Sequence, residues 1–454
     1  MALGAQPVNI IGAGLAGTLL AVLLARRGLA VQLYERRADP RRTAADAGRS
    51  INLALAARGI AALERADLMQ RVRPLMIAMR GRLVHEPGGA AMLRPYGQRE
   101  HEVIHSVGRA ALNRALIEAL AEYPAAALHF EHSCVGVRLD EGLLELHDRA
   151  AARTYCVPLG ATIAADGAGS TVRASLVAAG AVRVREESLD HDYKELTIPP
   201  LAGRFALEPH ALHVWPRRGF MLIALPNTDA SFTATLFLPR EGPVSFAALA
   251  AQPDPQPFFA REFGDATALM PDLRREFREH PQGRLGTVHT RPWHARGGVL
   301  LLGDAAHAIV PFHGQGMNAA FEDCRVLDEL LDGRHDWAGI FGEFEATRRP
   351  NAEAIARMAL ENYAEMREHV LEARFQRQQL LALELERRFP DRFIPRYSMV
   401  MFHPEIPYAE ALRRGRVQAQ LLDELDCGAG AAADAGPDAG RAERLIGERL
   451  APIA

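Results

Sequence analysis

A glycine pattern near the N-terminus constrains the fold of this chain more than any other feature. Residues 7–35 predict a complete βαβ unit, in which the strand VNII, a glycine turn, the apolar helix TLLAVLLARR and the strand AVQLYE follow one another. The turn places Gly12, Gly14 and Gly17 in the spacing GxGxxG. Glycines at these positions permit a tight turn, let a pyrophosphate approach the backbone and allow the helix to pack closely on the strand. The pattern predicts a Rossmann-like domain that binds a dinucleotide.

Further acidic residues indicate which dinucleotide binds. Glu35 ends the second strand, where the ribose of a bound dinucleotide needs a hydrogen-bond acceptor. Asp166 in DGAGSTVR and Asp304 in GVLLLGD each follow a predicted buried strand, where a second portion of an extended cofactor can be held. The chain holds one GxGxxG fingerprint, whereas a protein with two Rossmann cofactor domains would show two. These features favour FAD over NAD.

The composition is that of a globular enzyme and argues against several other classes. Lys and Arg number 53 against 56 Asp and Glu, for a formal net charge of −3, so the basic surplus of a nucleic-acid binder is missing. The four cysteines, at positions 134, 156, 324 and 427, form no CxxC pair, which fits a reducing cytoplasm. The longest apolar run, residues 19–25, is too short to cross a bilayer. We expect a cytoplasmic protein without a membrane anchor, a nucleic-acid partner or a metal.

The order of predicted elements gives an α/β fold with three parts and a tail. Residues 1–182, together with 286–340, are expected to form the Rossmann-like FAD-binding domain. Residues 183–285 contain β-rich runs such as GFMLIALP and SFTATLFLP, which predict an inserted antiparallel β-sheet that forms a substrate domain. Residues 341–425 predict a C-terminal helical region. Residues 426–454 include the low-complexity stretch CGAGAAADAGPDAG and are expected to be a flexible tail.

These motifs also resemble a known family. A GxGxxG turn, a DG turn and a GD strand, in this order, resemble the single-component FAD-dependent aromatic hydroxylases. Segments that are similar to the kynurenine 3-monooxygenases within it are GRSINLALAARG (48–59), MRGRLVH (79–85), DYKEL (192–196), VPFHGQGMNAAFEDC (310–324), ENYAEMR (361–367) and IPRYSMVMFHPEIPY (394–408). A match over so many separated segments is more specific than any single motif. The membrane anchor of the eukaryotic members has no counterpart in the tail from Cys427, so we expect a bacterial-type version.

The resemblance implies an FAD site that is assembled from separated segments. Asp304 would bind the ribityl chain, Arg109 would contact the cofactor from the side, and residues 316–318 would lie by the flavin ring. A helix is predicted to begin at Met317, and its N-terminus would stabilise negative charge on reduced flavin. The complete set is Gly12, Gly14, Leu15, Ala16, Gly17, Glu35, Arg36, Ala54, Arg109, Cys134, Asp166, Thr171, Asp304, Gly316, Met317 and Asn318.

The resemblance also implies the residues of a substrate site. Arg82 and Tyr96 match the pair that binds the substrate carboxylate, and Asn362 and Tyr397 match its partners in the C-terminal region. Arg suits this task because its fork donates two parallel hydrogen bonds to a carboxylate. The loop beside the aromatic ring of the substrate would consist of Pro311, Phe312 and His313.

The activity that the resemblance implies is the hydroxylation of L-kynurenine to 3-hydroxykynurenine, in tryptophan degradation and NAD biosynthesis. NADPH would reduce FAD, O2 would add to the reduced flavin, and the flavin hydroperoxide would deliver oxygen to the ring carbon ortho to the amine. No side chain is expected to act as the catalytic acid or base, because the ring amine already donates electrons. The docking site of NADPH and the assembly state, a homodimer included, stay open.

Alternatives remain from the residues themselves. The same architecture would serve a hydroxylase of another aromatic acid, or an FAD dehydrogenase or oxidase that hydroxylates nothing. HEVIH (101–105) fits the HExxH string of zinc proteases, which needs both histidines on one face of a helix, whereas the β-branched residues here predict a strand. His307 in DAAHA is expected to be a hydrogen-bonded structural residue, as buried polar groups usually are.

Overall fold

A parallel sheet forms the centre of the first layer, and the glycine turn lies at the carboxyl ends of its strands. The computed structural model describes residues 6–42, 52–88, 90–334, 336–365, 373–427 and 439–453. The six strands of the sheet are, in order, β18 (His294–Ala295), β19 (Val299–Leu301), β12 (Ala161–Ala164), β1 (Val8–Ile11), β2 (Val31–Glu35) and β8 (Ala126–Phe130). All neighbours pair in parallel except β18 and β19. The predicted α/β class and the βαβ unit are therefore confirmed.

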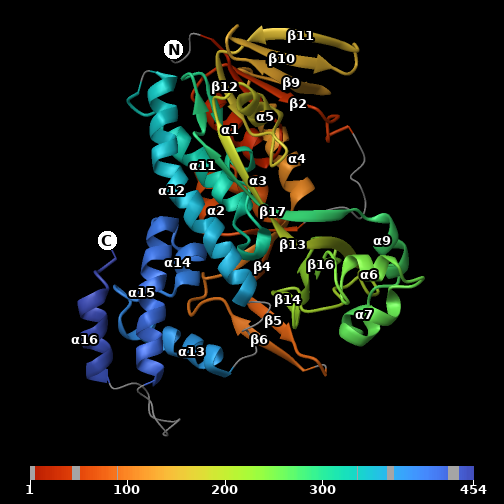
Figure 1. The fold of residues 1–454 in the computed structure, drawn as a ribbon, viewed down its shortest axis with the longest axis vertical. Coiled ribbons are helices and arrows are strands. Elements are labelled where there is room, and N and C mark those ends of the chain that lie inside the picture. The colour runs from red at the N-terminus through yellow and green to blue at the C-terminus, as the bar shows by residue number, and fades with distance from the viewer. Residues whose placement is uncertain are drawn as a thin grey trace.

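Helices and a small sheet cover this parallel sheet (Figure 1). The covering elements are α1 (Leu15–Arg26), α4 (Arg109–Leu120), α5 (Thr171–Ala178), α11 (Gly316–Leu330) and an antiparallel sheet of β9 (His132–Arg138), β10 (Leu143–Asp148) and β11 (Arg153–Pro158). Every residue of β1 and of β12 is buried, as expected of strands with both faces covered. The first helix runs from Leu15, directly after the glycine turn, so its free N–H groups face the carboxyl ends of the strands.

A seven-stranded sheet forms the second layer. Its strands are, in order, β17 (Gln282–Arg291), β13 (Arg183–Ile198), β16 (Phe232–Pro239), β15 (Phe220–Pro226), β14 (Ala211–Arg217), β5 (Gly81–His85) and β6 (Ala91–Pro95). The prediction of a purely antiparallel insertion was incomplete, since β5 joins from the N-terminal part and pairs in parallel with β14. Such a pairing joins segments about 130 residues apart, and no local pattern in either segment specifies it.

One face of the seven-stranded sheet is packed under short helices, and the other faces the rest of the molecule. The helices are α6 (Phe246–Ala250), α7 (Gln256–Glu262), α8 (Gly264–Thr267) and α9 (Leu273–Glu279). Alternate residues of β15 go to the two faces: Leu222 and Ala224 join the core under these helices, whereas Met221 and Ile223 point to the opposite side. Because side chains alternate between the two faces of a strand, the sheet has a second, apolar face that these helices do not cover. We call it the free face, and a site can be built on it.

A third, small sheet contains the end of the HEVIH segment. It consists of β3 (Asn52–Leu55), β7 (Ile104–Gly108) and β4 (Met76–Met79). His105 lies in β7, whereas His101 and Glu102 lie in the preceding turn, so the helix that a zinc-protease string requires is not formed. The Glu102 carboxylate instead accepts hydrogen bonds from the backbone N–H groups of Gln98 and Arg99, at 2.6 and 2.9 Å. Between β3 and β4 of this sheet the chain also forms α2 (Ala57–Arg65), α3 (Met69–Val72) and the 3-10 turn η1 (Arg73–Leu75).

Helices make up the C-terminal part, as the sequence predicts. They are α12 (Trp337–Ala364), α13 (Ala373–Arg388), α14 (Arg396–Phe402), α15 (Tyr408–Cys427) and α16 (Ala439–Arg449). The prediction of a flexible tail is wrong for residues 439–449, which form α16 and bury Ala442 and Ile446 against α13 and α15. Residues 428–438 of that predicted tail lie outside the described residues. The predicted domain boundaries themselves stay predictions.

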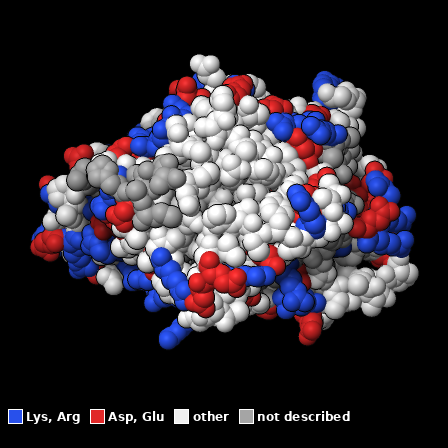
Figure 2. All heavy atoms as spheres, turned by 90° about the horizontal axis from the view of Figure 1, so that it is seen from above, with Lys and Arg blue, Asp and Glu red and all other residues white. Residues whose placement is uncertain are grey.

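Surface charge is mixed on the face that Figure 2 shows. Lys and Arg lie beside Asp and Glu around the edge of this face, and its middle is largely uncharged. No helix in the described ranges is long and apolar enough to cross a membrane. Among the same residues, no group of three or more His, Cys, Asp or Glu side chains is arranged to hold a metal ion.

Candidate active site

A cavity of about 500 Å³ lies between the parallel sheet, the free face of the seven-stranded sheet and the C-terminal helices. Its wall combines the glycine turn of the first layer with Met221 and Ile223 of the second and Tyr397 of the helical part. Two short elements close it, α10 (Asp304–His307) and the 3-10 turn η2 (Pro311–His313). Both come from the polar stretch that follows β19, so the chain places its mixture of small and polar residues where two sheets meet.

The glycine turn has the geometry that a pyrophosphate requires. Gly12 has a φ of +100°, and a Cβ there would lie 2.7 Å from the carbonyl oxygen of Ala165. A Cβ on Gly17 would collide with the carbonyl oxygen of Gly12. Gly14 caps α1, lines the cavity, and a Cβ there would meet nothing within 4 Å. The first turn of α1 contains no acidic residue, so its N-terminus is free to bind an anion.

Glu35 ends β2 beside this turn, as predicted. Its carboxylate accepts a hydrogen bond from the backbone N–H of Ala13 at 2.9 Å and another from Nε of Arg37 at 2.7 Å. Burial alone would raise the pKa of Glu35, but the hydrogen bonds from Arg37 and Ala13 lower it. The group is therefore a stable anion next to the turn. Arg36 is exposed and does not line the cavity.

The DG turn is held by its own helix. Asp166 Oδ2 accepts a hydrogen bond from the backbone N–H of Thr171 at 2.8 Å, which caps α5. Cys134 lies in β9 with its Sγ 3.7 Å from the carbonyl oxygen of Gly136, and burial raises the pKa of its thiol to about 12. None of Cys134, Asp166 and Thr171 lines the cavity. Contact of these three residues with a cofactor stays a prediction.

The segment after β19 brings Asp304 and the start of α11 to the cavity, as predicted. Asp304 follows Gly303, whose φ is +59°, and its side chain faces the cavity together with Arg109 from the start of α4. Burial raises the pKa of the Asp304 carboxyl, and the nearby His307 and Arg109 oppose that shift. Gly316 and Met317 at the N-terminus of α11 line the same wall.

Asn318 is committed to the protein rather than to the cavity. Its Oδ1 accepts the backbone N–H of Ala56 at 2.9 Å, and its Nδ2 donates to the carbonyl oxygens of Ala54 and Gly314, both at 2.8 Å. The side chain thus ties the start of α11 to β3. Both N–H donors of the amide are thus used within the protein, so Asn318 fixes the N-terminus of α11.

The predicted carboxylate pair lies at the opposite end of the cavity. The Arg82 guanidinium carbon lies 5.7 Å from the ring centre of Tyr96 and 5.0 Å from that of Tyr397. The two tyrosine rings are stacked, with centres 5.7 Å apart, and burial raises the pKa of both hydroxyls. Buried Nε of Arg82 and the hydroxyl of Tyr96 have no hydrogen-bond partner within the described part of the chain. Because these atoms belong to residues that line the cavity, a ligand bound there can supply their hydrogen bonds.

The loop of residues 311–313 lines the cavity, and Asn362 holds it. Nδ2 of Asn362 donates to the carbonyl oxygen of Phe312 at 2.6 Å, and Asn362 itself does not line the cavity. The Phe312 ring is stacked on Tyr363 at 3.8 Å between centres. The His313 ring is stacked on Tyr397 at 5.4 Å, and burial lowers the pKa of His313 to about 3, so this ring is neutral.

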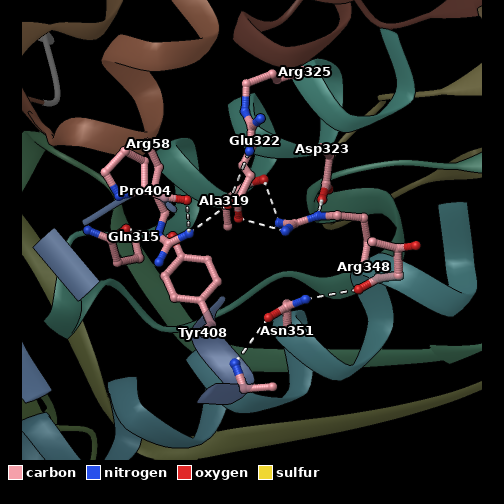
Figure 3. A network of polar contacts seen from close by, with 12 residues as sticks. Arg58, Gln315, Ala319, Glu322, Asp323, Arg325, Arg348, Asn351, Pro404 and Tyr408 are labelled. Atoms are coloured by element: carbon pink, nitrogen blue, oxygen red, sulfur yellow. Dashed lines mark hydrogen bonds and ion pairs between the residues drawn. The ribbon is translucent and has the colours of Figure 1, made fainter. Parts of the chain in front are cut away.

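A buried ion-pair network supports α11 from behind. Figure 3 shows Arg348 of α12 pointing toward two carboxylates of α11: Nη1 lies 2.6 Å from Glu322, and Nε lies 2.7 Å from Asp323. Asp323 also accepts the backbone N–H of Gly303 at 3.1 Å and lies 2.6 Å from Nε2 of His307. His307 therefore makes the hydrogen bond that its expected structural role requires.

The same network reaches the C-terminal helices. The Arg58 guanidinium lies 2.6 Å from Glu322 and 3.9 Å above the ring centre of Tyr408 (Figure 3). The Tyr408 hydroxyl donates to Oε1 of Gln315 at 2.7 Å, and Nε2 of Gln315 donates to Sδ of Met401 at 3.1 Å. Gln315, which directly precedes α11, is thus held in place by α15 and α14 of the helical part.

Sequence reasoning assigned no role to several other side chains that line the cavity. They are Tyr193, Glu195, Leu212, Met221, Ile223, Thr235, Phe237, Arg284 and Met401. Alternation in GFMLIALP was the available signal for Met221 and Ile223. The others depend on which face of the sheet meets the first layer, and no local pattern gives that information.

Comparison with known proteins identifies the family. The model of the FAD-binding domain family matches residues 5–359. The kynurenine 3-monooxygenase of Stenotrophomonas maltophilia (strain K279a) is 48% identical over 418 residues, which cover 92% of this chain and 91% of that protein. The enzyme of the same name from Xanthomonas campestris pv. campestris (strain 8004) is 48% identical over 431 residues, 94% of each chain. This chain belongs to the kynurenine 3-monooxygenase family. It is a flavin-dependent monooxygenase, as the resemblance implied.

Solved structures of other monooxygenases share the fold. A tetrameric form of 2-methyl-3-hydroxypyridine-5-carboxylic acid oxygenase has a TM-score of 0.64 at 18% identity, covering 80% of this chain and 93% of that one. The p-nitrophenol 4-monooxygenase PnpA from Pseudomonas putida DLL-E4 has a TM-score of 0.66 at 18% identity, covering 93% and 97%. The architecture of this family member is therefore that of the FAD-binding monooxygenases.

Two glycine variants separate fold from FAD binding. We expect Gly17→Ala to lower the stability of the apoprotein, because its Cβ collides with backbone. Gly14→Ala should leave stability unchanged, since its Cβ meets no protein atom. The added methyl group lies where a pyrophosphate would sit, so FAD affinity should fall about 5- to 150-fold, the equivalent of ~1–3 kcal/mol of overpacking. Flavin fluorescence titration and thermal melting of both apoproteins measure this, and equal destabilisation by the two variants would contradict it.

Proposed function

We propose that this chain hydroxylates L-kynurenine to 3-hydroxykynurenine, using FAD, NADPH and O2, in cytoplasmic tryptophan degradation and NAD biosynthesis. The observation that carries the proposal is the state of Arg82, a half-buried cation with a buried Nε that lines an apolar cavity between Tyr96 and Tyr397. A desolvated guanidinium without a carboxylate partner in the described residues suits a ligand that brings its own carboxylate. The names of the related proteins point to the same substrate.

The walls of the cavity suit an aromatic amino acid. Arg82 would bind the substrate carboxylate with two parallel hydrogen bonds, and the two tyrosine hydroxyls would add donors. From there the wall is formed by Leu212, Ile223 and other apolar side chains of the seven-stranded sheet, which exclude water from the aromatic ring. Neutral His313 places no second charge beside the guanidinium. The residues on this side therefore bind, orient and desolvate the substrate.

The other end of the cavity fits FAD. The open cradle at Gly14 before α1 would hold the pyrophosphate, Asp304 the ribityl chain, and the N-terminus of α11 the electron-rich edge of the ring. Bound FAD supplies the activation of oxygen, which no side chain of the cavity can perform. The task of this chain is to keep the substrate carboxylate and ring fixed relative to that end.

The direct test mixes purified, FAD-loaded protein with NADPH, oxygen and L-kynurenine. We expect 3-hydroxykynurenine in the mass spectrum, with NADPH consumption that depends on kynurenine. The control replaces kynurenine by 4-hydroxybenzoate, a phenolic acid that lacks the amino-acid group, and should give no hydroxylated product. A flavin-loaded protein that forms product from the phenolic acid and none from kynurenine would favour the alternative hydroxylase.

A further inference from the structure

Carboxylates are rare in the wall of the cavity. Within the described residues only Glu195 and Asp304 bring one there. Asp304 lies at the end that fits FAD, whereas Glu195 comes from β13 of the seven-stranded sheet. Glu195 is opposite Thr235 of β16, and Thr235 is opposite Ile223 of β15, so the three side chains form one row on the free face. A carboxylate thus continues the apolar floor on which the substrate ring would lie.

The Glu195 side chain is half-buried and has no hydrogen bond or ion pair among the residues that the structure describes. Its neighbour in the chain behaves differently, since Nζ of Lys194 points to the other face and donates to the carbonyl oxygens of Phe277 and His280 at 2.8 and 2.7 Å. Burial raises the pKa of the Glu195 carboxyl, and His280 and Arg109 act in the opposite direction; Nδ1 of His280 lies 2.8 Å from the backbone oxygen of Glu195, and Arg109 lines the same cavity. The carboxylate is therefore free to accept a hydrogen bond from a ligand in the cavity.

Glu195 and Arg82 line the same cavity from different strands of the seven-stranded sheet. Arg82 lies on β5 and Glu195 on β13, with β14, β15 and β16 between them. Four steps between neighbouring strands of ~4.8 Å place the two backbones about 19 Å apart. Both side chains line the cavity, and so do Leu212, Ile223 and Thr235 from the three strands between them. A substrate that is bound at Arg82 through its carboxylate would extend its ring over Ile223 toward Glu195.

We propose that Glu195 accepts a hydrogen bond from the amine on the aromatic ring of the substrate and is a catalytic residue of this enzyme. The proposal rests on the proposed function, which supplies a ring with that amine. When oxygen adds ortho to the amine, the nitrogen donates electron density and becomes more positive. A carboxylate facing that nitrogen binds it more tightly in the transition state than in the ground state. Glu195 would therefore select rings that bear an amine and accelerate their hydroxylation.

The experiment compares two ligands on the FAD-loaded enzyme: L-kynurenine, and its analogue in which hydrogen replaces the ring amine (β-benzoylalanine). Dissociation constants are read from the absorbance change of bound flavin. We expect the unaltered enzyme to prefer L-kynurenine roughly 10- to 150-fold, as a hydrogen bond to a charged group provides. Glu195→Ala removes the acceptor for the ring amine, so its affinity for L-kynurenine should fall while its affinity for the analogue stays unchanged. The variant should therefore bind the two ligands equally. Glu195→Gln should keep part of the preference, since its amide oxygen still accepts, and should lower kcat for L-kynurenine more than it raises KM.

Glu187→Gln is the matched control, because Glu187 lies on the same strand, is exposed and pairs with Arg185 at 2.9 Å. It should leave the preference and kcat unchanged. If the unaltered enzyme binds neither ligand, the proposed function falls and this inference falls with it. If the unaltered enzyme prefers L-kynurenine and both Glu195 variants, with full FAD content, keep that preference, only the role of Glu195 is overturned.

Discussion

Arg82→Met will weaken the binding of L-kynurenine by ~100-fold, while FAD content and stability stay unchanged. The reason is that the half-buried Arg82 guanidinium is the cation that the substrate carboxylate would meet in the cavity, and truncating one partner of a desolvated pair costs about 2–5 kcal/mol. Methionine fills a similar volume between Tyr96 and Tyr397 without a charge or a donor. The measurement is a flavin-monitored titration with L-kynurenine at a fixed ionic strength.

Arg80→Met is the control for the Arg82 variant. Arg80 directly precedes β5 and is exposed, so its guanidinium is screened by water and contributes little to any site. We expect its affinity for L-kynurenine to equal that of the unaltered enzyme. An Arg82→Met enzyme that binds kynurenine normally would contradict the carboxylate site and would direct attention to another anchor for the amino acid.

The parts of this enzyme that were predicted from sequence are those whose signals are local. The βαβ unit was predicted because all its signals, the glycine spacing and the two flanking strands, lie within residues 7–35. Helical periodicity likewise located α11, although the helix begins at Gly316 rather than Met317. The helix α16 was not predicted, because its apolar residues Leu445, Ile446 and Leu450 follow a Gly- and Ala-rich stretch whose composition is typical of a flexible segment.

The site was less readable, because its walls come from segments that meet only in the fold. The resemblance supplied Arg82, Asp304 and Tyr397, all of which line the cavity, but it could not show that Asn362 binds the carbonyl of Phe312. Glu195 lies in the DYKEL segment that carries part of the resemblance, but no role was predicted for it, since a Glu in a strand is usually a solvated residue. Glu195 lines the cavity because the seven-stranded sheet packs against the first layer, and this packing is a property of the tertiary structure.

The ion-pair network behind α11 was equally hidden from the sequence, and it supports the largest stability prediction. Arg348→Met should lower the free energy of unfolding by ~3–5 kcal/mol, as removal of one partner from a buried pair does. Arg348 and Asp323 are buried, and the variant leaves the charges of Asp323 and Glu322 with weaker compensation. Arg71→Met is the control: Arg71 pairs with Glu122 on the surface at 2.7 Å, and its loss should cost about 0–1 kcal/mol. Urea unfolding of both apoproteins measures the difference.

The pH dependence of this effect distinguishes lost charge pairing from lost packing. Burial alone would raise the pKa of Asp323, but His307 and Arg348 lower it, and Arg348 and Arg58 likewise lower that of Glu322. Carboxylates with a lowered pKa stabilise the folded state above their unfolded pKa, and this contribution is lost as the pH falls through the folded value. The stability gap between the unaltered enzyme and Arg348→Met should therefore be widest near neutral pH and shrink in acid. A gap that is the same at pH 7 and below pH 4 would mean that Arg348 acts through packing, and α11 would then be held at the FAD end of the cavity by shape rather than by charge.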